Sequence, residues 1–207
     1  MKLIDGLKLQ GLPALIPDSS REELPEVFKN MGFKVGAEIG VYRGEFTKLF
    51  CEAGMKMSAI DPWMAYLGAG RSENKADKQD VNYESAKQTL SPFPDCKLIR
   101  KTSMKALEEF EDNSLDFAYI DGDHRFKFIA EDLVEWSKKV KVGGVISGHD
   151  YFYTSPTANN VICHVGPVVN AFVKASGIPN FYVFGKTEPQ ESAKKNDKTL
   201  SWMWIKN

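Results

Sequence analysis

The chain has 207 residues, 43% hydrophobic and 27% charged, a composition typical of one soluble globular domain and a length too short for two comfortable ones. With 27 Lys and Arg against 28 Asp and Glu, the formal net charge is -1, so no basic bias points to nucleic acid or an anionic membrane surface. No apolar run approaches the ~20 residues of a membrane-spanning helix, and the N-terminus does not resemble a signal peptide. Cys51, Cys96 and Cys163 form no Cys-x-x-Cys pair, which favours free thiols in a reducing compartment. We therefore expect a cytoplasmic protein.

Strands and helices are predicted to alternate along most of the chain. Residues 1–20 contain prolines and glycines without a clean hydrophobic period, and we expect a lead-in that docks on the domain or on a partner. Ser20 can cap a helix that runs to about Met31. The elements predicted after it are strand 34–40, helix 45–53, strand 57–60, helix 73–90, strand 96–99, helix 103–110, strand 115–120, a helix across 126–136, strand 142–147, helix 165–175, and strands 181–184 and 202–205.

This alternation predicts an α/β fold with a Rossmann-like, doubly wound sheet that helices cover on both faces. We expect seven strands, mostly parallel, with the last two forming an antiparallel C-terminal hairpin joined by the very polar segment 186–198. The sequence shows no internal repeat and no sign of a second domain. Residues 21–207 are therefore predicted to form a single domain behind the lead-in of residues 1–20.

Ionisable residues stand at the ends of four predicted strands. Glu38 ends the first strand, Asp61 the second and Asp121 the fourth, and the fifth is followed by His149 and Asp150. In open parallel sheets, ligands bind beyond the carboxyl ends of the strands, where the strand order reverses. Five such groups along one edge of a sheet predict a functional site there.

The loop after the first strand carries two glycines, Gly40 and Gly44. A dinucleotide site requires Gly-x-Gly-x-x-Gly, and a phosphate-binding loop ends in Gly-Lys-Ser/Thr; neither pattern is present. Asp61 follows about 20 residues later, where a carboxylate can accept hydrogen bonds from a ribose. These features favour a nucleoside ligand without a buried diphosphate. The alternative is that the glycines serve only the turn from strand to helix.

Four segments, taken in order, resemble the motifs of class I S-adenosylmethionine-dependent methyltransferases. They are Ala-Glu-Ile-Gly-Val-Tyr-Arg-Gly at 37–44, Ala-Ile-Asp-Pro-Trp at 59–63, Phe-Ala-Tyr-Ile-Asp-Gly-Asp-His at 117–124 and Gly-Gly-Val-Ile-Ser-Gly-His-Asp-Tyr at 143–151. The last two resemble a small branch akin to the metal-dependent O-methyltransferases of the catechol, caffeoyl-CoA and macrolide-sugar types. This resemblance implies a methyltransferase domain that acts on a hydroxyl of a small molecule or sugar.

The resemblance also implies a set of cofactor contacts, carried over by position. Residues implied to surround S-adenosylmethionine are Glu38, Gly40, Val41, Tyr42 and Gly44 at its methionine end, Asp61 at the ribose, Ser103 and Met104 at the adenine, and Asp121 beneath the sulfonium.

A divalent metal is the second implication of the resemblance. Asp121 would be the first ligand, and His149 and Asp150 stand where the relatives place two more ligands, usually Asp-Asn or Glu-Asp. Carboxylates suit Mg²⁺, whereas an imidazole shifts the preference toward manganese, iron or zinc. The prediction is a Mg²⁺ or Mn²⁺ site formed by Asp121, His149 and Asp150. Alternatively, His149 acts as a base or orients Asp150 without touching metal.

Methyl transfer to oxygen requires that the acceptor hydroxyl lose its proton while it lies in line with the sulfonium methyl group. A metal can lower the pKa of the hydroxyl and orient it. Without a metal, His124 or His149 can accept the proton. Asp121, His124 and His149 are thus the predicted catalytic residues. The alternative for His124 is a surface position at which it caps the following helix.

Several aromatic residues near the strand ends could form a wall for a flat or sugar-like acceptor, with core packing or a lid as the alternative for each. They are Trp63, Tyr66, Tyr151, Phe152 and Tyr153.

Two other functions stay open at this point. One is a nucleotide-cofactor oxidoreductase on a similar sheet, against which the missing third glycine argues. The other is a non-catalytic module that keeps the cofactor pocket, against which the joint presence of Asp121, His124, His149 and Asp150 argues. No nucleic acid or membrane partner is expected, and the apolar lead-in could serve a homo-oligomer.

Overall fold

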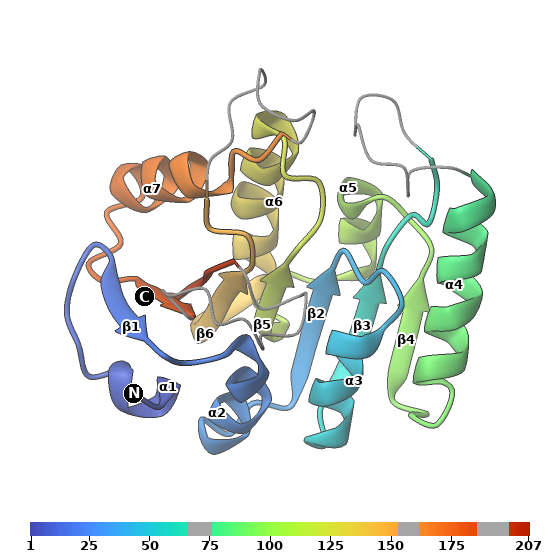
Figure 1. Ribbon diagram of the computed structural model, residues 1–207, viewed down its shortest axis with the longest axis horizontal. Helices are drawn as coiled ribbons and strands as arrows, with labels where there is room; N and C mark the ends of the chain where they lie inside the picture. The colour runs from blue at the N-terminus through green and yellow to red at the C-terminus, as the bar shows by residue number, and fades with distance from the viewer. Residues whose placement is uncertain (66–75, 153–161, 186–198) are drawn as a thin grey trace.

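The computed structural model describes residues 1–65, 76–152, 162–185 and 199–207. In these ranges the chain forms an eight-stranded sheet between two layers of helices (Figure 1). The strands are β1 (Ala14–Pro17), β2 (Val35–Ile39), β3 (Lys56–Ile60), β4 (Cys96–Ile99), β5 (Leu115–Ile120), β6 (Val140–Gly148), β7 (Tyr182–Gly185) and β8 (Ser201–Ile205). The helices are α1 (Leu3–Gly6), α2 (Leu24–Asn30), α3 (Glu45–Glu52), α4 (Ala76–Leu90), α5 (Ser103–Ala106), α6 (Phe126–Lys139) and α7 (Val165–Ala175), with 3-10 turns η1 (Arg21–Glu23) and η2 (Leu107–Glu109).

The strand order is β1-β7-β8-β6-β5-β2-β3-β4. Strands β2 to β6 pair in parallel, whereas β8 runs antiparallel to both of its neighbours, β6 and β7. The chain builds the sheet outward from β2 to β4 and then returns to place β5 on the other side of β2. The strand order therefore reverses between β2 and β5. The predicted Rossmann-like, doubly wound sheet with its antiparallel C-terminal hairpin is confirmed.

The described part of the chain contains one strand more than the seven predicted. β1 lies within the N-terminal lead-in and pairs in parallel with β7, with Ala14 opposite Tyr182 and Pro17 opposite Gly185. Four residues are too few to show a hydrophobic alternation, and a proline inside an apolar run argues against a strand unless the strand lies at an edge. β1 is such an edge strand, so its proline removes no hydrogen bond from the middle of the sheet.

The fifth predicted strand, at 142–147, is part of the longer strand β6. The strand begins at Val140, and its pairing with β5 shifts register between Leu115 and Phe117. Gly143 lies at this shift and has a φ of 79°, a conformation that glycine adopts at little cost. The glycine pair Gly143-Gly144 thus lies inside β6, at this shift in register.

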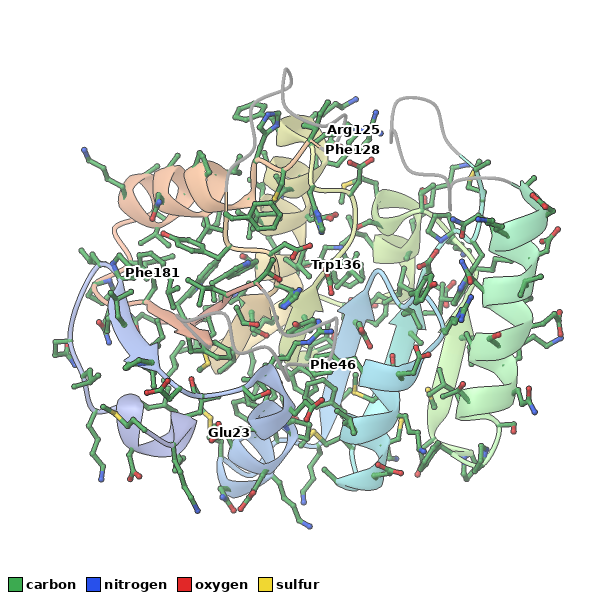
Figure 2. The ribbon with its side chains drawn as sticks, in the orientation of Figure 1. Glu23, Phe46, Arg125, Phe128, Trp136 and Phe181 are labelled. Carbon is green, nitrogen blue, oxygen red and sulfur yellow. The ribbon has the colours of Figure 1, made fainter. Side chains whose placement is uncertain are left out.

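Side chains of β5 alternate between the two faces of the sheet, as a strand requires. Phe117 and Tyr119 pack with residues of α1, α2 and α3, and Ala118 and Ile120 pack with residues of α5, α6 and α7. Figure 2 shows Phe46 on α3 and Trp136 on α6, which belong to these opposite layers. With both faces covered, ligands can approach β5 at its ends.

Among the described residues, none of the helices combines the length and the apolar character needed to cross a membrane.

Candidate active site

The register of the parallel strands brings their carboxyl ends to one level. Ile39 of β2 lies opposite both Ile60 of β3 and Ile120 of β5, and Ile120 in turn lies opposite Gly148 of β6. The residues that directly follow these four positions therefore stand in a row at the edge of the sheet. They are Gly40, Asp61, Asp121 and His149, which the sequence analysis selected as site residues.

The loops after β2 and β5 meet where the strand order reverses. Asp121 donates its backbone N–H to the carbonyl of Ile39 at 2.7 Å. Gly40 has a φ of 91°, and a Cβ at this position would lie 2.2 Å from the carbonyl oxygen of Asp121. Only glycine fits such a close approach, so Gly40 is required for the two loops to pack together. In open parallel sheets, this reversal point is where ligands bind.

Asp61 holds the loop after β2 through its backbone. The Oδ2 atom of Asp61 accepts the N–H groups of Val41 at 3.0 Å and Tyr42 at 3.1 Å, and Oδ1 accepts the N–H of Trp63 at 2.7 Å. Burial raises the pKa of the Asp61 carboxyl, which these three hydrogen bonds partly offset. Asp61 was predicted to bind a ribose. In the structure, its carboxylate fixes the loop that carries Val41 and Tyr42.

Three residues along this edge have left-handed backbone conformations that are unusual outside glycine. Their φ angles are 56° at Tyr42, 40° at Trp63 and 53° at Asp150. Such conformations cost on the order of 1–3 kcal/mol each and cluster at functional sites. They follow β2, β3 and β6, so the strained positions coincide with the predicted site.

Glu38 lies beneath the loop rather than on its surface. Its side chain is buried and accepts a hydrogen bond from the hydroxyl of Thr47, in the first turns of α3. Burial raises the pKa of Glu38 to about 8, and the hydrogen bond from Thr47 opposes this shift. The carboxyl is thus largely protonated at neutral pH. Gly44, at the N-terminus of α3, has a φ of 84° and ends the loop.

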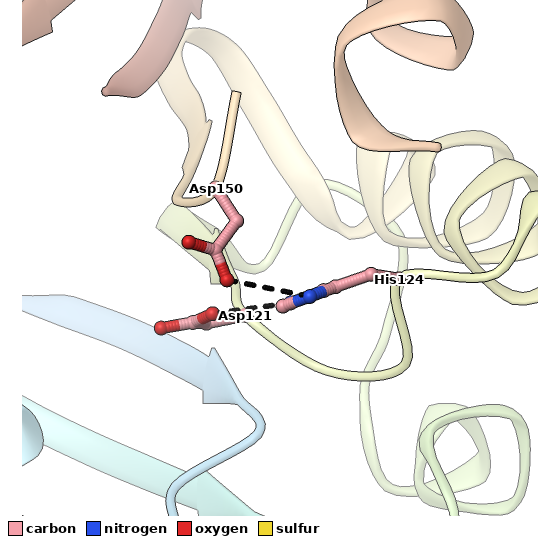
Figure 3. Close-up of side chains that lie close together, drawn as sticks. All are labelled: Asp121, His124 and Asp150. Atoms are coloured by element: carbon pink, nitrogen blue, oxygen red, sulfur yellow. Dashed lines mark ion pairs between the residues drawn. The ribbon is translucent and has the colours of Figure 1, made fainter. Parts of the chain in front are cut away.

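Asp121, His124 and Asp150 come together beyond β5 and β6 (Figure 3). The Nε2 atom of His124 lies 3.4 Å from Oδ1 of Asp121, and its Nδ1 atom lies 3.3 Å from Oδ2 of Asp150. One nitrogen or oxygen atom from each of the three residues lies within 4.8 Å of the others. Two carboxylates and an imidazole at this spacing are a donor set suited to a divalent transition metal.

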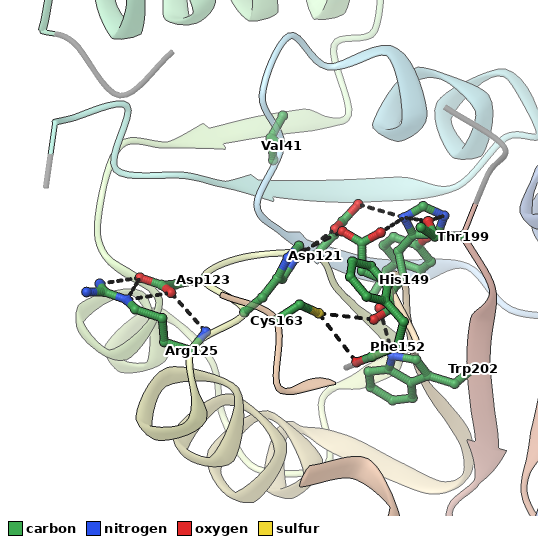
Figure 4. A network of polar contacts seen from close by, with 12 residues as sticks. Val41, Asp121, Asp123, Arg125, His149, Phe152, Cys163, Thr199 and Trp202 are labelled. Carbon is green, nitrogen blue, oxygen red and sulfur yellow. Dashed lines mark hydrogen bonds and ion pairs between the residues drawn. The ribbon is translucent and has the colours of Figure 1, made fainter. Parts of the chain in front are cut away.

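His149 lies beside the same two carboxylates. Its Nδ1 atom is 3.4 Å from Oδ1 of Asp150 and 4.0 Å from Oδ2 of Asp121. The hydroxyl of Thr199 lies 3.1 Å from Nε2, and the indole of Trp202 donates to the carbonyl of His149 at 3.1 Å (Figure 4). Burial lowers the pKa of His149, while Asp121 and Asp150 act in the opposite direction. His149 is therefore a neighbour of the group formed by Asp121, His124 and Asp150, and it is not one of its three members.

Arg21 reaches the site from the N-terminal part of the chain and was missed by the sequence analysis. Its Nη1 atom donates to Oδ2 of Asp121 at 3.2 Å and to the hydroxyl of Tyr119 at 3.3 Å. Burial alone would raise the pKa of Asp121, but the hydrogen bond that it accepts from His124 and the charges of His149, His124 and Arg21 bring the pKa below its usual range. In the sequence, Arg21 is one charged residue among several at a helix start, and no signal there links it to Asp121.

Ser103 and Met104, predicted to edge the adenine, lie at the start of α5. The hydroxyl of Ser103 donates to a carboxylate oxygen of Asp132 and accepts the indole N–H of Trp136 at 2.7 Å. Met104 packs against the core. Burial raises the pKa of Asp132 to about 7. A sequence signal existed for Asp132, because it falls on the buried stripe of α6, three residues after Ile129.

Three members of the predicted aromatic wall lie among the described residues, and each has core or helix contacts. Trp63 is buried and packs against the ring of Tyr83, with 4.9 Å between ring centroids, so it belongs to the core. Tyr151 donates its hydroxyl to Asn170 of α7 at 2.8 Å. Phe152 is half-buried against the core. The remaining two members, Tyr66 and Tyr153, lie outside the described residues.

Two neighbours of His124 have structural roles. Asp123 pairs with Arg125, whose Nε donates to its carboxylate at 2.9 Å, so Asp123 does not join the metal-type group (Figure 4). At the start of α6, the backbone N–H of Phe126 donates to Nδ1 of His164 at 2.9 Å. His164 thus takes the helix-capping position that was the alternative for His124.

Comparison with known proteins identifies a family and a fold. Residues 37–151 match the family described as Methyltransferase domain. The uncharacterized protein y4gI of Sinorhizobium fredii is 26% identical over 119 residues, which are 55% of this chain. The chain spans only 12% of the length of that curated relative.

Solved structures with similar folds differ in what they methylate. One is TomG of Streptomyces achromogenes, an O-methyltransferase involved in tomaymycin synthesis and solved in complex with SAM. Its TM-score is 0.60 at 13% identity, and the match covers 90% of this chain and 79% of TomG. An O-methyltransferase of Bacillus cereus in complex with SAH has a TM-score of 0.56 and 18% identity. That match covers 89% of this chain and 80% of the other. An rRNA methylase of Streptococcus thermophilus has a TM-score of 0.52 and 12% identity, and the match covers 84% of this chain and 87% of the other. At these identities the likeness concerns the fold, so the acceptor must be argued from the site.

Proposed function

Because the chain belongs to the Methyltransferase domain family, we propose that it transfers the methyl group of S-adenosylmethionine to a hydroxyl group of a small molecule or sugar. The observation that carries the proposal is the convergence of Asp121, His124, His149 and Asp150 at the carboxyl ends of β5 and β6, beside the point where the strand order reverses. That position favours ligand binding, and the residues there are able to accept a proton. The family membership disfavours the oxidoreductase alternative.

The cofactor pocket is proposed to lie between the loops after β2 and β5. Gly40 lets the two loops approach each other closely at their junction, and Asp61 fixes the amides of Val41 and Tyr42. In this proposal Asp61 binds the ribose when it exchanges a loop amide for a ribose hydroxyl. When bound, S-adenosylmethionine supplies an electrophilic methyl group. Asp121 then faces the sulfonium, where its ionised carboxylate favours the positive charge.

The proton of the acceptor hydroxyl is proposed to pass to an imidazole. His124 contacts both Asp121 and Asp150, so its ring is oriented and the positive charge it gains is balanced by two carboxylates. His149 faces the same pair and is the second candidate. General base catalysis of this kind contributes about 10²- to 10⁴-fold to a rate. Positioning of the acceptor oxygen in line with the methyl group supplies a further share.

A divalent cation is proposed at the same carboxylates. Asp121 and Asp150 would supply oxygen ligands, and the 4.8 Å grouping favours His124 over the predicted His149 as the nitrogen ligand. This donor set fits Mn²⁺ better than Mg²⁺, because magnesium prefers an all-oxygen shell. A bound cation would lower the pKa of an acceptor hydroxyl, and His149 would then be left to accept the proton.

Calorimetric titration with S-adenosylhomocysteine tests the cofactor. We expect saturable binding by the wild type and at least tenfold weaker binding by Asp61→Ala, since the variant loses both the loop contacts and the ribose acceptor. Asp112→Ala is the matched control, because Asp112 pairs with Lys139 away from this edge. Absence of binding by the wild type would overturn the proposal. Binding without methyl transfer to any catechol, phenol or sugar tested would favour the non-catalytic module.

A further inference from the structure

Arg21 places a guanidinium group against Asp121 from a position 100 residues earlier in the chain. It donates to Oδ2 of Asp121 at 3.2 Å and lies over the ring of Phe46, with 4.8 Å between its central carbon and the ring centroid. Only 16% of the Arg21 side chain is exposed, against 22% for Asp121. A surface ion pair contributes little and is easily exchanged, whereas this pair is largely removed from water.

The backbone that carries Arg21 is held in place by the N-terminal segment. Ser20 caps η1, and Glu23 completes a capping box. The carboxylate of Glu23, which Figure 2 labels, accepts the N–H of Ser20 through Oε1 and the N–H of Leu3 through Oε2, both at 2.9 Å. Glu23 thus ties the start of α1 to the turn that presents Arg21. The backbone of the turn that carries the arginine is therefore held beside the site.

The two oxygens of Asp121 face different partners. Oδ2 accepts the hydrogen bond from Arg21, and Oδ1 faces Nε2 of His124, within the group that also contains Asp150. A divalent cation in that group would share one carboxylate with a guanidinium. Like charges a few ångströms apart in a partly buried site repel strongly, because little water lies between them.

We propose that Arg21 is the resident counter-ion of Asp121 and competes with any divalent cation that binds to Asp121, His124 and Asp150. The inference rests on the proposed function for the location of the cation. It adds that the N-terminal segment regulates the cation affinity of the site. Without a divalent cation, Arg21 pairs with Asp121 and helps to balance its charge. Cation binding must weaken the contact between Arg21 and Asp121.

Titration with Mn²⁺ alone, followed by the electron paramagnetic resonance signal of free Mn²⁺, tests the competition in the full chain without cofactor. We expect Arg21→Gln to bind Mn²⁺ about tenfold more tightly than the wild type, because one nearby positive charge is removed. Arg21→Lys keeps the charge and should stay within about threefold of the wild type. Arg100→Gln is the matched control, since Arg100 pairs with Asp80 at the same edge and should leave the affinity unchanged.

Equal or weaker Mn²⁺ binding by Arg21→Gln would overturn the proposal, and so would a lack of binding by every variant. A second measurement needs no substitution and covers the case in which Arg21→Gln does not fold. In hydrogen–deuterium exchange of the wild type, saturating Mn²⁺ should speed exchange in residues 18–24, and unchanged or slower exchange would contradict the proposal. Since S-adenosylhomocysteine is absent throughout, failure here leaves the test of the methyltransferase function untouched.

Discussion

Strand β5 carries an aspartate next to each of its ends, and the two differ in what surrounds them. Asp116, near the amino end, accepts the backbone N–H groups of Lys34 at 2.5 Å and Val35 at 2.8 Å and pairs with Lys141. Asp121, at the carboxyl end, is surrounded by the ionisable side chains of Arg21, His124 and His149. Neither residue is largely exposed, and the pKa of each is lowered against the effect of burial.

This difference teaches that a shifted pKa does not by itself mark a functional site. The partners of Asp116 are two amides and a lysine, which hold β5 to the start of β2 and do not change state near neutral pH. The partners of Asp121 include two histidines, which can gain or lose a proton in that range. We therefore propose a structural role for Asp116 and a catalytic role for Asp121, and four predictions test the roles of the charged and buried groups around this site.

The largest expected effect is the loss of methyl transfer in Asp121→Asn. The amide cannot supply the negative charge that His124 and the proposed cation require, so we expect activity to fall by about 10²- to 10⁴-fold. Asp116→Asn is the control and should retain wild-type activity per folded molecule. The measurement is transfer of a radiolabelled methyl group to the best acceptor in a panel of hydroxyl compounds. Similar losses in both variants would remove the distinction between the two aspartates.

Glu38 offers a third kind of buried carboxyl, one that stays protonated. Its folded-state pKa of about 8 exceeds its ordinary 4.5, so the folded protein keeps a proton that the unfolded chain releases. Stability of the wild type should therefore fall as pH rises from 4.5 to 8. Glu38→Gln lacks this slope and should gain about 2 to 5 kcal/mol over the wild type across that window. Thermal unfolding between pH 5 and pH 9 measures the gain, and a constant difference at all pH values would show that Glu38 does not titrate there.

A smaller effect is expected on stability when Asp116 is changed. Asp116→Asn loses the pair with Lys141 and turns one amide donor toward the N–H groups of Lys34 and Val35. We expect the free energy of unfolding to fall by about 1 to 3 kcal/mol. Urea unfolding measures the change, with Asp112→Asn as a surface control. A loss no larger than that of the control would mean that Asp116 does not stabilise the strand.

Among the four, the smallest effect is expected from Thr199→Val, which removes the hydroxyl 3.1 Å from Nε2 of His149 and little else. A lost hydrogen bond of this kind costs about 0.5 to 1 kcal/mol, which corresponds to about two- to fivefold in kcat. The pH profile of kcat separates a role in orienting His149 from a general loss of stability, because only the former shifts the profile. An unchanged kcat and profile would mean that His149 does not depend on Thr199.

Most of the sheet could be predicted from the sequence because its strands are apolar and end in clear stops. Strands 96–99 and 115–120 and helix 165–175 begin and end where predicted. β1 could not be predicted, since four residues carry too little pattern and its pairing with β7 joins positions far apart in the chain. The sequence analysis missed Arg21 for the same reason, because its partner Asp121 lies far away in the chain and becomes its neighbour only in the fold.

Candidate site residues could be predicted where they follow strands and not where they depend on side-chain geometry. The strand-end rule places Gly40, Asp61, Asp121 and His149 in one row, as the register shows. Which histidine joins Asp121 and Asp150 depends on side-chain directions, and no spacing in the sequence encodes that choice. The cofactor and metal roles assigned to these residues stay predictions until a ligand is bound.

A crystal structure of the protein with S-adenosylhomocysteine tests the central claim most directly. We predict that the nucleoside lies between the loops after β2 and β5, with its ribose at Asp61 and its sulfur facing Asp121, His124 and Asp150. That result would place the transferred methyl group beside the residues that accept the proton. A nucleoside bound elsewhere, or a sulfur directed away from Asp121, would contradict the assignment of this edge as the active site.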